Sequence, residues 1–113
     1  MPSGMPRKTS VADRTRLRLD LNSPAFLDVF FDLPSSDLSH VVAGLQRLRR
    51  MTWADVYRSK GLHWEAVNHI TTPTGAKAHS LRLSQKMRAI AFRDGEFLRI
   101  VSLHPDHDSA YDK

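Results

Sequence analysis

Apolar and polar residues along the chain alternate with two different periods, one typical of strands and one of helices. Residues 16–21 alternate leucine with charged residues, which predicts a half-buried strand. Residues 23–33 open with Ser-Pro and are followed by a proline, so they predict a helix with defined ends. Residues 35–50 carry apolar side chains at i, i+3, i+4 and i+7, and predict a second helix. The short link between the two predicts a helical hairpin.

The apolar faces of these two helices supply much of the expected core. In the first helix the face comprises Phe26, Leu27, Phe30 and Phe31, and in the second Leu38, Val41, Val42, Leu45 and Leu48. A third, short helix is expected after Thr52, because Asp55 stands at the spacing of a capping box, and Gly61 should stop it. Residues 63–70 form a possible further strand.

The last third of the chain predicts three consecutive strands. Leu81 and Leu83 alternate with polar residues, and apolar-rich runs follow at 87–93 and 97–103. Asp94-Gly95 between those runs is a strong hairpin signal. Leu81 and Leu83 should face the helices and Arg82 the opposite side of the sheet.

The order of these elements predicts an α+β fold. An N-terminal strand and a helical hairpin should pack on a C-terminal antiparallel β-meander. Residues 1–14 are expected to be a flexible lead, because three prolines and glycines interrupt a segment of low apolar content. Residues 15–113 should form a single domain.

Composition narrows the class of protein. The chain has 113 residues and no cysteine, which excludes disulfides, cysteine-bound metals and a cysteine nucleophile. It has no apolar run long enough to cross a bilayer and no apolar core of a secretory signal near its start, so a cytoplasmic protein without membrane contact is expected.

The charge balance is basic and uneven. Lys and Arg number 17 against 12 Asp and Glu, a net charge of +5. Residues 77–99 hold six cations and two carboxylates, whereas residues 23–46 hold three Asp and no Lys or Arg. Such a balance favours nucleic acid or an acidic partner, although a generic basic protein would show it too. Arg47, Arg49 and Arg50 close the second helix, either as a solvated helix end or as contacts to phosphates or an acidic partner.

Residues 104–111 read His-Pro-Asp-His-Asp-Ser-Ala-Tyr and concentrate groups able to carry protons. Together with Arg82 and Arg88 on the neighbouring strands, they suit RNA cleavage, which needs proton transfer and a cation at the phosphate. Two alternatives stay open. The run could be a solvated cap after the last strand. It could also hold a metal through His104, His107 and Asp108 with a further histidine, namely His63, His69 or His79.

The order and the motifs of the chain resemble the RelE/ParE superfamily of toxins from type II toxin–antitoxin systems. The residues that carry the likeness are 18–27 at the first strand and helix start, Leu33-Pro34, the two strand segments 80–84 and 87–90, the Asp94-Gly95 hairpin, and the closing His-x-x-His-Asp-x-Ala-Tyr. The likeness spans residues 16–112 and is most specific in the last thirty-odd. Residues 51–75 form a longer connection than compact members need.

The resemblance implies a RelE-like toxin that cuts messenger RNA on the ribosome without a metal or other cofactor. It implies catalytic roles for Arg82, Arg88, His107 and Tyr111, and RNA binding by Lys86, Arg93 and His104. The partner would be a cognate antitoxin, bound through a helix. Because the ParE branch instead poisons DNA gyrase, a gyrase inhibitor or an inert antitoxin-binding relative is the alternative.

Overall fold

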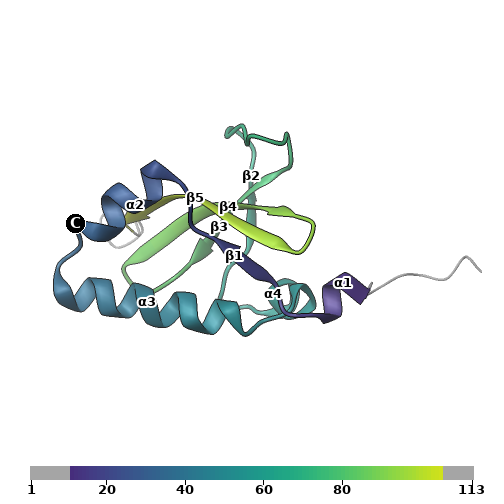
Figure 1. Ribbon diagram of the computed structural model, residues 1–113, viewed down its shortest axis with the longest axis horizontal. Coiled ribbons are helices and arrows are strands. Elements are labelled where there is room, and N and C mark those ends of the chain that lie inside the picture. Colours follow the sequence, from purple (N-terminus) through teal and green to yellow (C-terminus); the bar gives the residue numbers. More distant parts are fainter. Residues whose placement is uncertain (1–10, 106–113) are drawn as a thin grey trace, which may run out of the picture.

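The computed structural model describes residues 11–105, which form a five-stranded sheet with its helices gathered on one face (Figure 1). The sheet order is β1-β5-β4-β3-β2. An α+β architecture is therefore confirmed. The elements in chain order are α1 (Val11–Arg14), β1 (Arg18–Asp20), α2 (Pro24–Phe31), α3 (Ser35–Arg49), α4 (Trp53–Arg58), β2 (Glu65–Val67), β3 (Ala78–Arg82), β4 (Met87–Asp94) and β5 (Phe97–Pro105). No helix in this part of the chain is long and apolar enough to cross a membrane.

The predicted C-terminal meander is confirmed, but the whole sheet is mixed. Strands β3, β4 and β5 pair antiparallel in sequence, and Gly95 turns the β4–β5 hairpin with φ of 64°. Strand β2 extends the meander antiparallel at one edge. Strand β1 lies parallel to β5 at the other edge, with Arg18 opposite Phe97. The sequence pattern predicts only antiparallel pairing, whereas the observed sheet also contains the parallel pair of β1 and β5.

A β-bulge in β5 keeps Ile100 and Leu103 on the same, helical face of the sheet. Ile90 of β4 faces Ser102, whereas the next residue, Ala91, faces Ile100, so Val101 is the extra residue. Without the bulge, Ile100 and Leu103 would point to opposite faces, because side chains alternate along a strand. Both are 2% exposed, which shows that the bulge serves the core.

One continuous core lies between the helices and the inner face of the sheet. Leu81 and Leu83 are buried in it, as predicted. The buried members are Leu17, Phe26, Val41, Leu45, Leu48, Trp53, Val56, Leu81, Leu83, Met87, Ala89, Ala91, Leu98, Ile100 and Leu103. Phe31 differs from the expected apolar face of the first helix, since it is 70% exposed at the end of α2.

The residues predicted to begin α4 and α2, Thr52 and Ser23, make different hydrogen bonds. Thr52 and Asp55 form the expected capping box, each side chain accepting a hydrogen bond from the backbone N–H of the other. The hydroxyl of Ser23 makes no capping bond and instead donates to the carbonyl of Val101 at 2.6 Å. Ser23 therefore fastens the start of α2 to the bulge of β5.

The last four residues of the predicted N-terminal lead contact the sheet. Residues 11–14 form the single turn α1, and Asp13 pairs with Arg93 of β4 at 2.5 Å. These four residues belong to the segment predicted to be a flexible lead. Tertiary structure provides this contact, because the partner of Asp13 lies 80 residues further along the chain.

Leu45 offers a test of the core. Its side chain belongs to the buried stripe of α3 and is 7% exposed. Leu45→Ala should lower the free energy of unfolding by about 2–3 kcal/mol, because truncation removes buried methyl groups and leaves a cavity. Chemical denaturation checks this. Leu38→Ala, on the half-buried first part of the same helix, should lower the free energy of unfolding clearly less. Equal losses in the two variants would show that Leu45 is no more buried than Leu38.

Candidate functional site

The sheet face opposite the helices carries a row of three basic side chains. Arg82 of β3 pairs with Arg88 of β4, and Arg88 pairs with His104 of β5. Directly paired residues have Cβ atoms about 4.5–5.5 Å apart on the same face. The pairing therefore brings together three residues that the sequence had singled out separately. We call Arg82, Arg88 and His104 the basic row.

This face is outside the core. The row residues lie between the buried positions Leu81, Leu83, Met87, Ala89 and Leu103, so their side chains point to the other side of the sheet. Arg82 and Arg88 are partly exposed and His104 is exposed. The helices of the described range 11–105 pack against the buried positions of the other face.

Two serines on the same face of the sheet, Ser80 of β3 and Ser102 of β5, contact two of the basic side chains. Arg88 donates from Nη2 to Oγ of Ser80 at 3.0 Å. The hydroxyl of Ser102 and Nε2 of His104 are 2.7 Å apart. Sequence reasoning assigned no role to Ser80 or Ser102. The alternation of β3 and β5 was the available signal, since each serine lies two residues from a row member and hence on its face.

The electrostatics of the row favour an anion. Two arginines are directly paired across β3 and β4, and like charges at directly paired positions destabilise a sheet through repulsion. Neither the row nor the adjacent row of Ser80, Ile90 and Ser102 contains a carboxylate. A bound phosphate would accept hydrogen bonds from both guanidinium groups and relieve the repulsion.

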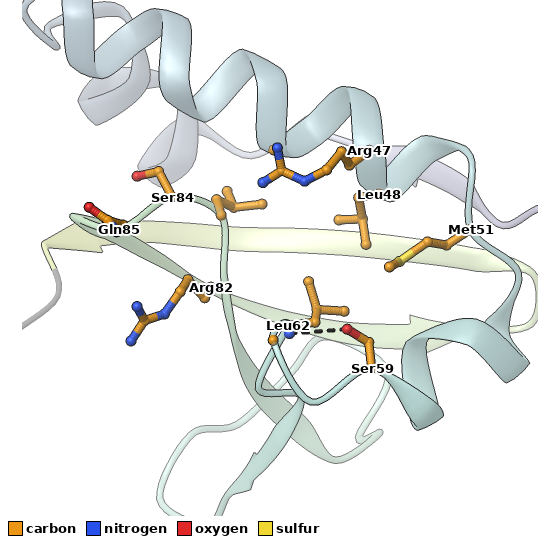
Figure 2. A pocket seen from close by; sticks show the side chains of 11 residues that line it. Arg47, Leu48, Met51, Ser59, Leu62, Arg82, Ser84 and Gln85 are labelled. Atoms are coloured by element: carbon orange, nitrogen blue, oxygen red, sulfur yellow. Dashed lines mark hydrogen bonds between the residues drawn. The ribbon is translucent and has the colours of Figure 1, made fainter.

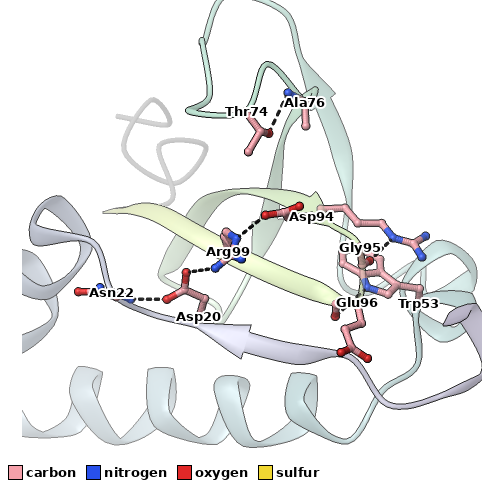
Figure 3. A network of polar contacts seen from close by, with 10 residues as sticks. Asp20, Asn22, Trp53, Thr74, Ala76, Asp94, Gly95, Glu96 and Arg99 are labelled. Atoms are coloured by element: carbon pink, nitrogen blue, oxygen red, sulfur yellow. Dashed lines mark hydrogen bonds and ion pairs between the residues drawn. The ribbon is translucent and has the colours of Figure 1, made fainter.

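At the other end of the same face, carboxylates hold a third arginine, Arg99. Arg99 donates to Asp94 at 2.8 Å and to Asp20 at 2.5 Å (Figure 3). The backbone N–H of Asn22 and the Arg99 guanidinium lower the pKa of Asp20 below its ordinary value. This network joins β1 to β5 and to the end of β4.

Lys86 and Arg93 lie apart from the row. Lys86 is in the β3–β4 turn, and its ammonium is 3.5 Å from a carboxylate oxygen of Asp37 on α3. Arg93 lies towards the other end of β4, where it bonds Asp13 and Tyr57 and stacks over Trp53 with 4.7 Å between its guanidinium carbon and the ring centroid. The structure does not bring Arg93 to the basic row, and its contacts tie α1 and α4 to the sheet.

The remaining predicted residues are at the C-terminus. His107 and Tyr111 lie outside the described residues, as does Asp108. Within residues 11–105, no three histidine, aspartate or glutamate side chains gather as metal ligands would. Of the histidines considered as further ligands, His63 lies 3.7 Å from a carboxylate oxygen of Glu65, and His79 stacks on Trp64.

The burial of His79 on the helical face predicts how the stability of the protein depends on pH. Its ring lies parallel to that of Trp64, with 4.4 Å between centroids, and burial lowers its pKa below the ordinary 6.5. The unfolded chain therefore binds this proton at a higher pH than the folded chain does. Stability should fall as the pH drops below about 6.5, and the loss should level off below the folded pKa. Denaturation between pH 7.5 and 5 should show a smaller loss for His79→Gln, and identical slopes would contradict the assignment.

Comparison with known proteins gives little beyond this geometry. No protein-family model and no curated protein matches the chain. A solved structure of a copper-bound mutant toxin from Helicobacter pylori aligns over 81% of this chain and 97% of its own, with 12% identity and a TM-score of 0.44.

Proposed function

We propose that this protein is the toxin of a type II toxin–antitoxin system and acts as a ribosome-dependent, RelE-like endoribonuclease that halts translation in the cytoplasm. The observation that carries the proposal is the basic row, in which Arg82 and Arg88 face each other beside His104. The resemblance of residues 80–90 and 104–111 to the RelE/ParE toxins supports it from the sequence.

The arrangement suits cleavage of RNA by its own 2′-hydroxyl. In that reaction O2′ bonds to the adjacent phosphorus and the P–O5′ bond breaks, which gives a 2′,3′-cyclic phosphate and a 5′-hydroxyl. One group removes the proton from O2′, and another protonates the leaving O5′. Arg82 and Arg88 would stabilise the extra negative charge on the phosphate. His107 is the proposed proton-transfer group, with His104 of the row as the second candidate, and Tyr111 would position or activate the O2′ hydroxyl.

The cognate antitoxin is the proposed protein partner. A basic toxin with a net charge of +5 would attract an acidic antitoxin segment over a distance. Lys86 and Arg93 remain proposed RNA contacts outside the row. Their ion pairs with Asp37 and Asp13 would have to rearrange for either to contact phosphate.

Cell-free translation with the purified protein tests the function. We expect messenger cleavage, read by primer extension, at defined codon positions and only when ribosomes are present. Naked messenger RNA is the control and should stay intact. If a properly folded protein leaves ribosome-bound messenger intact, the endoribonuclease proposal is wrong, and DNA gyrase supercoiling becomes the next assay.

A further inference from the structure

A polar-walled groove with an apolar floor runs beside the basic row. Two adjoining cavities of about 420 and 260 Å³ share Arg47, Ser84 and Gln85. The larger lies between α3, the 59–62 loop and the β3–β4 turn, and the smaller continues along α3 to His40. Both fall near the size of small-molecule sites, which are about 300–1,000 Å³. We call this continuous depression the α3 groove.

The floor of the α3 groove is apolar, so a flat group of a ligand could pack against it. Leu48 lines it from α3 and Met51 from just after that helix, Leu62 from the 59–62 loop and Leu83 from just after β3. Figure 2 shows Arg47 descending from α3 towards the turn that carries Ser84 and Gln85, with the apolar side chains beside and below it. The groove therefore presents an apolar surface next to a cation.

Among residues 11–105, the groups that wall the α3 groove are basic or neutral and polar, and none is a carboxylate. Within the described residues, no side chain bonds the guanidinium of Arg47 or the amide of Gln85, whereas Ser84 and Ser59 accept bonds from backbone N–H groups. Arg93 and Arg99, in contrast, are held by carboxylates. Arg47 and Gln85 are thus the wall groups available to an incoming ligand.

Arg82 connects the groove with the basic row. The side chain of Arg82 lines the groove at the end of β3, while its guanidinium points away from α3 (Figure 2). Its pairing with Arg88 places it in the row as well. Arg82 is therefore shared by the groove and the row, and a strand of RNA whose scissile phosphate lies on the row would pass this residue on its way into the groove.

We propose that the α3 groove is a nucleotide-binding subsite that receives the nucleotide next to the scissile phosphate. The base would lie on the floor formed by Leu48, Met51 and Leu62, and the amide of Gln85 would read its polar edge. Arg47 would bind the outer phosphate of that nucleotide. The inference deepens and rests on the proposed function, because only an RNA substrate would join the groove to the row.

Binding of free nucleotides tests the groove without any cleavage. The four 5′-nucleoside monophosphates are titrated into the ¹⁵N-labelled full chain, with ribose 5-phosphate and inorganic phosphate as probes that lack a base. We expect amide shifts at Gly44, Gly61 and Gln85, and tighter binding for at least one nucleotide than for ribose 5-phosphate. Arg47→Gln should weaken that binding about tenfold, the effect of losing a charge-assisted hydrogen bond.

Arg49→Gln is the matched control, since it makes the same charge change on the same helix but does not line the groove. It should leave nucleotide binding unchanged. Gln85→Ala should narrow the differences among the four bases. Equal binding of ribose 5-phosphate and nucleotides, equal losses in Arg47→Gln and Arg49→Gln, or no binding at all would each overturn the subsite.

The outcome is separable from that of the proposed function. A protein that binds nucleotides in the groove and cuts no messenger would keep the subsite and lose the endoribonuclease role. A protein that cuts messenger, with the same codon preference in wild type and Gln85→Ala and no nucleotide binding, would keep the role and lose the subsite.

Discussion

Gly44→Ala should prevent stable folding, or lower the free energy of unfolding by about 3 kcal/mol or more, although alanine favours helices over glycine. Gly44 is buried in α3 where this helix crosses the end of β3. A Cβ atom there would lie well inside the contact distance of the Leu83 carbonyl oxygen and 2.9 Å from its carbonyl carbon. Backbone cannot swing aside as a side-chain end can, so the helix would have to move off the sheet.

Gly61→Ala is the control for this prediction. A Cβ at Gly61 would meet nothing within 4 Å, and no positive φ constrains the residue. Its unfolding transition should stay close to that of the wild type. Thermal and urea unfolding followed by circular dichroism would measure both variants, and a Gly44→Ala protein of wild-type stability would contradict the close approach of α3 and β3.

Arg82→Gln and Arg88→Gln should each lower ribosome-dependent messenger cleavage by about 10²-fold or more, as removal of one preorganised charge-stabilising donor does in other enzymes. Both guanidinium groups are in the basic row, where each would donate to the phosphate as its negative charge grows. Arg88→Lys should restore little, because lysine keeps the charge but lacks the bidentate fork. Cleavage rates from primer extension under single-turnover conditions would measure the loss.

The stability of both glutamine variants has to be measured together with their cleavage rates, because Arg88 also donates a hydrogen bond to Ser80. Replacing one member of a like-charged cross-strand pair removes repulsion, so neither glutamine variant should unfold at a much lower temperature. Arg49→Gln again serves as the charge-matched control and should cleave like the wild type. Retention of cleavage in the folded Arg82→Gln and Arg88→Gln proteins would remove the basic row from catalysis.

Much of the secondary structure was predictable because its signals are local. The capping residues Thr52 and Asp55 form their box as predicted, since both partners lie within one helical turn. Leu81 and Leu83 point inward because strand alternation is a property of the backbone. Ser23 shows the limit of such signals, since its hydroxyl makes no capping bond and instead donates to the carbonyl of Val101, 78 residues away.

The candidate site was predictable only in part. Arg82, Arg88 and His104 were identified by residue type and by family likeness, but nothing local placed them in one row. Arg93 carries the same charge and lies on the same strand as Arg88, yet Asp13, Tyr57 and Trp53 hold it elsewhere. Periodicity says which face a side chain takes, whereas its neighbours depend on strands distant in sequence.

The sequence by itself determined the types of element, their order, their approximate ends and the inward side of most of them. These follow from side-chain spacing, caps and turn residues, which act over a few positions. Only the tertiary structure decided that β1 runs parallel to β5, that Val101 bulges, that Gly44 lets α3 approach β3, and that three basic residues form a row. Register, close approach and cross-strand pairing arise from contacts between segments far apart in the chain, and the spacing of residues within one segment carries no information about them.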